Sequence, residues 1–309
     1  MLLSGNTAAI VMTLLALDGG HGAAQDASQN RKLCGDPNPD ISIAGCTAII
    51  QARREAGRAL AEAFADRGVA YMTLQDFDRA IQDLSQAIKI DPANPKAFAN
   101  RGAAYGARQE WDEAIRDFSQ VVALDPSSAR AFSDRAGMYL LARQDDRAIQ
   151  DYTEAIKLDP TFVEAILNRG LILASTTRCG QAIADFTRVV ESNPKEARAY
   201  LERGVCYEAA GRNDAALEDL SAHLQLEPRS FTGLERRAEL FFRTREYDRA
   251  LDDYAHALTI VPNSARSLYG QGLLKRIKGD IRGGDADIAM AAALRPAIAD
   301  EMAARGLKP

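Results

Sequence analysis

Arginine and aspartate recur in step through most of the chain, at intervals of 34 residues. A row of arginines could form a strip that binds anions. Alternatively, each arginine could pair with an aspartate and link helices within or between repeats. We favour the pairing because the two charges appear jointly, and such pairs can specify how elements stack more than they stabilise them. The arginines are Arg67, Arg101, Arg135, Arg169, Arg203 and Arg237, and the aspartates are Asp83, Asp117, Asp151, Asp185, Asp219, Asp253 and Asp287.

The three histidines offer little catalytic chemistry. His21 lies in the N-terminal segment, His223 falls at an expected core position, and His256 lies next to one. The sequence contains no HExxH motif, phosphate-binding loop, GxSxG motif or Cys–His arrangement with room around it. We therefore expect no catalytic residue, no metal site and no cofactor, and the protein is not expected to be an enzyme.

The four cysteines form two candidate pairs. Cys34 and Cys46 bracket a proline-rich turn, and a disulfide between them would pin the turn to the helix that follows. Closing this loop would be worth about 3 kcal/mol, and the bond would persist only in an oxidising compartment. We favour the disulfide over the alternative, which is two free thiols with Cys46 buried in the core. Cys179 and Cys206 could meet between stacked neighbours or could be isolated core residues, and the sequence does not decide between these.

These residues are held by a repeated pair of helices. In repeats that start at residue 61, position 8 is always Gly or Ala and position 20 is Ala in six repeats of seven. Positions 4, 8 and 11 share one face of a first helix, and positions 20 and 24 share one face of a second. Proline at position 32 ends the second helix, since it cannot donate a hydrogen bond to the preceding turn. The prolines are Pro92, Pro126, Pro160, Pro194, Pro228, Pro262 and Pro296.

This pattern resembles the tetratricopeptide repeat family, whose signature is W-x2-L-G-x2-Y, A-x3-F and P within 34 residues. The resemblance covers seven tandem repeats, residues 61–298. The chain departs from the family at position 4, where another apolar residue replaces Trp, and at position 7, where Arg replaces Leu. The resemblance implies an all-α fold, a right-handed superhelical solenoid of seven helix-turn-helix repeats.

Both ends of such an array need caps, because a single repeat cannot bury its own apolar face. Residues 25–60 are expected to form a Cys-containing leader and a half repeat, in which residues 43–50 read as a stray second helix. Residues 299–309 are expected to form the C-terminal cap. Its helix should turn Ile298, Met302 and Leu307 inward and Arg305, with its acidic neighbours, outward.

The resemblance also implies a concave groove, formed by positions 2, 5, 6, 9, 12 and 13 of the first helices. Small and aliphatic groups would form its floor, and the polar residues at position 6 would bind a main chain or favour a partner with basic residues. The alternative is that these residues are only the solvated face of each helix. The groove candidates are Asp66, Val69, Asn100, Asp134, Leu140, Asn168, Leu171, Glu202 and Val205.

The first 24 residues do not fit the repeat. An apolar run over residues 7–17 precedes Gly22-Ala23-Ala24, a small-residue site suited to signal cleavage before Gln25. The run is too short to span a bilayer. No Lys or Arg precedes it, which leaves a cytoplasmic tail as the alternative. We expect residues 1–24 to be a signal peptide and the protein to be periplasmic or secreted, as in the tetratricopeptide proteins of Gram-negative bacteria that the leader resembles.

Charge and composition limit the function classes. The net charge of −5 and the absence of a basic block argue against nucleic acid as the partner. The leading hypothesis is a non-catalytic scaffold that binds a protein or peptide in its groove. The alternative is a structural subunit of a cell-envelope assembly or export complex, and a cytoplasmic chaperone adaptor is more remote.

Overall fold

In a computed structural model of the chain, residues 27–308 can be described; they form α-helices joined by short turns, and they contain no strand. The expected signal peptide, residues 1–24, lies outside these described residues. The chain divides after Pro160 into two compact bodies, an N-terminal body and a C-terminal body. None of the helices within residues 27–308 is both long and apolar enough to cross a membrane.

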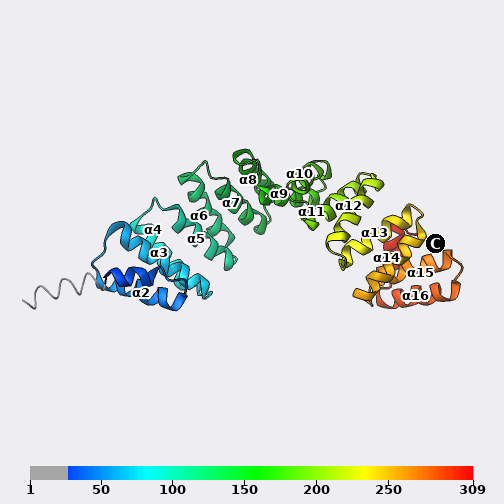
Figure 1. The fold of residues 1–309 in the computed structure, drawn as a ribbon, viewed down its shortest axis with the longest axis horizontal. Coiled ribbons are helices and arrows are strands. Elements are labelled where there is room, and N and C mark those ends of the chain that lie inside the picture. The colour runs from blue at the N-terminus through cyan, green and yellow to red at the C-terminus, as the bar shows by residue number, and fades with distance from the viewer. Residues whose placement is uncertain (1–26, 309) are drawn as a thin grey trace, which may run out of the picture. The chain divides into compact units, whose positions relative to one another are not determined.

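The N-terminal body contains the leader and the first three repeats (Figure 1). A short helix over residues 27–34 and α2 (Pro39–Ala52) precede the repeats. The three helix pairs that follow are α3 (Gly57–Thr73) with α4 (Phe77–Ile90), α5 (Pro95–Ala107) with α6 (Trp111–Leu124), and α7 (Ala129–Leu141) with α8 (Asp145–Leu158).

The C-terminal body contains the last four repeats and one further helix, α17 (Ile298–Ala304). The seven helix pairs expected from the sequence are present among the described residues, and before them α2 (Pro39–Ala52) extends beyond the expected helix of residues 43–50 at both ends. The four pairs of this body are α9 (Val163–Ser175) with α10 (Cys179–Ser192), α11 (Ala197–Ala209) with α12 (Asn213–Leu226), α13 (Phe231–Arg243) with α14 (Tyr247–Ile260), and α15 (Ala265–Ile277) with α16 (Ile281–Leu294).

Local sequence signals set where these helices begin and end. Asn94 caps α5 by accepting hydrogen bonds from the amides of Lys96 and Ala97, and Pro95 occupies the first turn, where no N–H is needed. At the other end of the pair, α6 stops at Leu124, two residues before Pro126. The repeating proline therefore ends the second helix, as its geometry requires.

The turn between the two helices of each repeat contains a residue in the left-handed region, at position 15. Only two of the seven are glycine, Gly211 and Gly279, with φ of 70° and 93°. At the other five positions, the left-handed conformation costs about 1–2 kcal/mol, because the Cβ atom of an L-residue comes too close to the following carbonyl oxygen. The five are Gln75, Gln109, Arg143, Thr177 and Arg245, with φ between 59° and 66°.

Arg143→Gly is therefore expected to stabilise the N-terminal body, by about 1 kcal/mol at most, because glycine also gains freedom in the unfolded chain. The reciprocal change Gly211→Arg should destabilise the C-terminal body by a similar amount, since an added Cβ meets no atom within 4 Å and only the backbone conformation matters. Urea unfolding would measure both. Arg143→Ala is the control, and a gain for alanine equal to that for glycine would contradict the backbone explanation.

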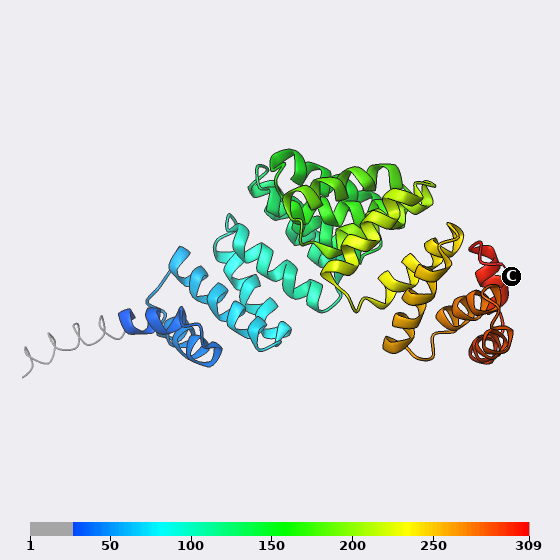
Figure 2. The same cartoon turned by 45° about the vertical axis from the view of Figure 1, so that its right-hand side comes forward.

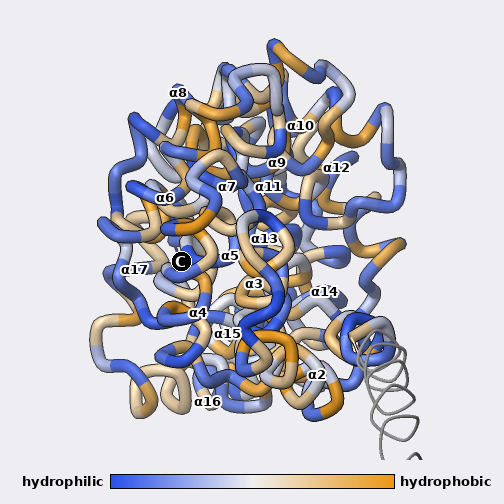
Figure 3. The backbone as a smooth tube through the Cα atoms, turned by 90° about the vertical axis from the view of Figure 1, so that its left-hand side faces the viewer, coloured by the Kyte–Doolittle hydropathy of each residue, from blue (hydrophilic) through white to orange (hydrophobic). Residues whose placement is uncertain are grey.

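The small residues at positions 8 and 20 mark the helix crossings. A Cβ added to Gly102 would lie 3.0 Å from the ring of Phe118, and Ala114 is fully buried in the same repeat. Hydrophobic and hydrophilic stretches alternate along the tube of the chain, as expected for helices with one buried face (Figure 3). The crossing inferred from the sequence is confirmed.

The N-terminal cap contains the expected disulfide, whereas one expectation for the C-terminal cap is wrong. Cys34 and Cys46 form a disulfide that joins the helix over residues 27–34 to α2, and both cysteines are buried. At the other end, Ile298, Met302 and Leu307 are fully buried, as expected. The outward orientation expected for Arg305 is wrong: its guanidinium pairs with Glu239 of α13, at 2.7 Å.

Candidate functional site

The recurring arginines and aspartates form ion pairs between the two helices of a repeat. In the second repeat, Arg101 Nε and Nη2 donate to Asp117 Oδ2 and Oδ1 at 2.8 and 2.7 Å, and Nη1 donates to Ser85 Oγ at 3.0 Å. Asp117 is 4% exposed. The hydrogen bond to Asp117 raises the pKa of Arg101. The same bidentate pair occurs in six repeats.

Arg101 is also held from other sides, as are the other arginines that have an aromatic residue in the same repeat. The guanidinium carbon of Arg101 lies 5.8 Å from the centre of the Phe98 ring and 5.9 Å from that of Tyr105, a cation–π arrangement. The contact to Ser85 reaches the second helix of the preceding repeat. The structural interpretation of the charges is therefore confirmed, and these arginines are occupied by the protein itself rather than offered to an anion.

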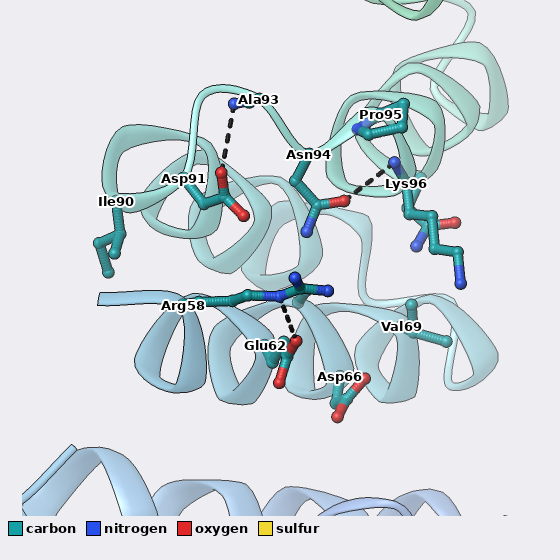
Figure 4. A pocket seen from close by; sticks show the side chains of 12 residues that line it. Arg58, Glu62, Asp66, Val69, Ile90, Asp91, Ala93, Asn94, Pro95 and Lys96 are labelled. Carbon is teal, nitrogen blue, oxygen red and sulfur yellow. Dashed lines mark hydrogen bonds and ion pairs between the residues drawn. The ribbon is translucent and has the colours of Figure 1, made fainter. Parts of the chain in front are cut away.

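A cavity of about 750 Å³ lies on the first-helix face of the N-terminal body. Figure 4 shows α3 on one side and the connection from α4 to α5 on the other. Arg58 Nε donates to Glu62 Oε1 at 2.9 Å across one turn of α3, so the cavity contains both charges. It is lined by Arg58, Glu62, Ala65, Asp66, Val69, Ile90, Asp91, Ala93, Asn94, Pro95, Lys96 and Asn100.

Asp66 has an unusual environment in this cavity. Burial, and secondarily the negative charge of Glu62, raise the pKa of its carboxyl group. Its Oδ2 lies 3.9 Å from Cys34 Sγ, and in Figure 4 the carboxylate points away from the α4–α5 connection. Two smaller cavities, of about 260 and 190 Å³, share Asp66 and Cys34 in their lining. The disulfide-linked leader thus lines the two smaller cavities, which share Asp66 with the large one.

The structure brings three of the nine groove candidates together, since Asp66, Val69 and Asn100 all line this cavity. Val69 is 40% exposed and Asn100 is half-buried. Asp134 pairs with Arg130 on the same helix, at 2.8 Å. The remaining candidates are half-buried on first helices: Asp134 and Leu140 on α7, Asn168 and Leu171 on α9, and Glu202 and Val205 on α11. Their role in binding stays a prediction.

Several cavity residues were missed by sequence reasoning. Arg58 and Glu62 lie near the start of α3, which begins four residues before the repeat does. The repeat pattern could not indicate Arg58, because it precedes position 1. Asn94 lies in the connection, outside the positions of the groove, although its role as a helix cap is visible from the Asn-Pro pair. Glu62 and Lys96 both stand at position 2, which the pattern assigns to the groove, although neither is among the nine groove candidates.

The remaining candidates for chemistry are structural. His223 is 2% exposed, and its two ring nitrogens lie 2.9 Å from the carbonyl oxygen of Ala197 and 2.7 Å from Ser230 Oγ. Cys179 and Cys206 are free thiols, and burial, followed by a hydrogen bond with Cys179, raises the pKa of Cys206 to about 12. Within residues 27–308, no group of three His, Cys, Asp or Glu side chains could hold a metal ion.

Comparison with known families follows the helix pairs. The description "TPR repeat" matches residues 68–108, and "Tetratricopeptide repeat" matches residues 95–128, 167–231 and 209–265. Together these matches cover about half of the chain. The protein belongs to the tetratricopeptide repeat family. No curated protein matches the chain.

Solved structures show the same fold. A crystal structure of the MamA protein is 27% identical and covers 55% of this chain and 92% of its own, with a TM-score of 0.52. YrrB, described as a TPR protein with an unusual peptide-binding site, is 21% identical and covers 62% and 97%, with a TM-score of 0.54. The C-terminal part of a TPR repeat-containing protein from Cytophaga hutchinsonii is 18% identical and covers 78% and 98%, with a TM-score of 0.63.

Proposed function

We propose that this tetratricopeptide repeat protein is a non-catalytic scaffold that binds an extended segment of a partner protein in the cavity between α3 and α5. The observation that carries the proposal is the cavity itself, which places Asp66, Val69 and Asn100 on one surface. The description of YrrB as having a peptide-binding site supports a peptide ligand for this fold.

The lining suggests how a segment would be held. The side-chain amide of Asn100 carries both a donor and an acceptor, so it can bond to a peptide main chain without selecting a sequence. Val69 offers an exposed apolar contact. Three acidic residues, Glu62, Asp66 and Asp91, line the cavity against two basic ones, Arg58, which already pairs with Glu62, and Lys96. A segment with Lys or Arg beside its apolar residues fits this arrangement.

We also propose that the protein works in the periplasm or outside the cell. The Cys34–Cys46 disulfide supports this location, because such bonds persist in oxidising compartments. Recovery of the protein from the periplasmic fraction with its N-terminus near Gln25 would support the proposal, and an intact Met1 in the mature protein would contradict it.

A displayed peptide library selected on the immobilised full chain would supply ligands for the test. Asn100→Ala should lower the affinity of the protein for the selected peptides by roughly two- to tenfold, the range expected for one lost hydrogen bond. Asp112→Asn, an exposed change on α6, is the control and should leave affinity unchanged. If Asn100→Ala and the control bind alike, the segment does not lie in this cavity, and a structural role of the outer face becomes the better account.

The raised pKa of Asp66 gives a second signature. A basic segment needs the ionised carboxylate, so its affinity should fall as the pH drops through the raised pKa, at a higher pH than an ordinary aspartate would show. Asp66→Asn should remove this part of the pH dependence. Added salt should weaken binding, because charges exposed to solvent are screened. Affinity that is flat in both pH and salt would rule out the preference for basic segments.

A further inference from the structure

The C-terminal segment, residues 298–308, lies on the first helices of the last two repeats. Ile298, Met302 and Leu307 are fully buried in one cluster with residues of α13 and α15, including Leu268 and Leu273. Figure 2 shows this segment, drawn in red, beside the orange helices of the last repeat. The segment therefore covers an apolar surface on α13 and α15.

An ion pair joins the segment to the same surface. Arg305 Nη1 lies 2.7 Å from Glu239 Oε2. A Cβ added at Gly306 would lie 3.3 Å from Cδ of Arg243, so the chain also passes closely over the end of α13. Arg305 and Glu239 are 66 residues apart, whereas the regular arginine pairs span 16 residues within one repeat. The segment thus reaches back over two repeats.

The carboxylate beneath this segment is poorly satisfied. Glu239 is 3% exposed, and its Oε1 has no hydrogen-bond partner among the described residues. Burial raises the pKa of Glu239 even though Arg305 opposes that shift. Glu208 of α11, whose negative charge also acts on Arg305, pairs with Arg243 through Oε1, whereas its buried Oε2 makes no hydrogen bond among the described residues and has only a long ion pair, of 4.0 Å, with Arg236. Such atoms are costly inside a fold and indicate that a second polar group can be accommodated there.

We propose that the first-helix face of α13 and α15 is a binding site for amphipathic segments of partner proteins, and that residues 298–308 occupy it as a displaceable internal ligand. The partner segment would carry apolar side chains with the spacing of Ile298, Met302 and Leu307 and a basic residue placed like Arg305. This site lies in the C-terminal body and does not depend on the cavity at α3 and α5.

A fluorescent peptide with the sequence of residues 297–308 is the probe, titrated against the full chain. The attached segment competes at a high effective concentration, so the unmodified protein should bind the peptide weakly. Met302→Asp combined with Leu307→Asp should detach the segment and tighten peptide binding roughly tenfold or more. Adding Glu239→Gln to this variant should weaken binding again by roughly tenfold, because a charge-assisted hydrogen bond is lost. A peptide with glutamate in place of its arginine should bind no better than background.

Arg305→Gln provides an independent test that introduces no charge into the apolar cluster. It should tighten peptide binding to the full chain by roughly threefold, since it removes only the ion pair of the attached segment. Circular dichroism would show whether the variant with both Met302→Asp and Leu307→Asp is folded. If that variant is unfolded, the effect of Arg305→Gln on peptide affinity tests the proposal in its place. Peptide affinity unchanged by detaching the segment, or indifferent to Glu239→Gln, would overturn the proposal. Loss of peptide binding at the α3–α5 cavity would not affect this result.

Discussion

Asp117→Ala is expected to destabilise the second repeat by about 3 kcal/mol, one of the largest effects of any single change in the chain. The substitution leaves Arg101 between two aromatic rings and Ser85, without the carboxylate that accepts two of its hydrogen bonds. Removing one partner of a buried pair is costly because the other charge remains desolvated. Urea unfolding, followed by the fluorescence of Trp111 at the start of α6, would measure the loss of stability.

Two comparisons separate this explanation from a general loss of charge. Asp112→Ala removes an exposed carboxylate from the same helix and should change stability by no more than about 0.5 kcal/mol. Arg101→Met combined with Asp117→Leu should cost less than Asp117→Ala alone, because no unpaired charge is left in the core. If Asp117→Ala costs no more than Asp112→Ala, the arginine pairs do not hold the helices together.

Loss of the Cys34–Cys46 disulfide should destabilise the leader by about 3 kcal/mol, the value expected for a closed loop of this length. The bond fixes the helix over residues 27–34 against α2, and Ser42 Oγ donates to the carbonyl oxygen of Cys34 at 2.6 Å in the same turn. In the double change Cys34→Ser with Cys46→Ser, hydrogen exchange should accelerate in α2 by roughly a hundredfold, the factor that corresponds to about 3 kcal/mol.

The other two cysteines provide the control for this experiment. Cys179→Ser with Cys206→Ser changes free thiols in the C-terminal body and should leave exchange in α2 unaltered. A reductant should accelerate hydrogen exchange in α2 of the unmodified protein as much as the double change Cys34→Ser with Cys46→Ser does. Equal protection of α2 before and after reduction would contradict a stabilising role for the bond.

Most of the fold could be predicted from the sequence because each repeat position has one physical task. The glycine or alanine at position 8 must lie under the residue at position 24, and proline must follow the second helix. Seven copies of these constraints fix the helix pairs. The pairing of Arg101 with Asp117 was also accessible, since the two charges recur jointly.

Other features depend on contacts that a single repeat does not contain. The bond from Arg101 to Ser85 crosses to the preceding repeat, although Ser or Thr at position 25 of the first five repeats could have indicated it. The contact between Arg305 and Glu239 breaks the register, so no repeat pattern could foresee it. The left-handed turn at Arg143 was hidden because a non-glycine residue stands where glycine is favoured.

The sequence predicted which repeat positions would face the groove, but not the cavity that they form. The sequence indicated Asp66, Val69 and Asn100, but Arg58 and Asn94 complete the cavity from a helix extension and a connection. Such closure depends on how α3 and the α4–α5 connection approach each other, which periodicity does not encode.

Site-specific photocrosslinking tests the central claim most directly. A photoreactive amino acid is placed either at Val69, in the cavity, or at Leu124, at the end of α6. Both side chains are apolar and 40% exposed, so the two sites differ mainly in their location. Each variant is irradiated with peptides selected on the unmodified protein. We predict crosslinks at Val69 that Asn100→Ala diminishes, and few at Leu124. Crosslinks at Leu124 with none at Val69 would contradict the proposal that the α3–α5 cavity binds the partner.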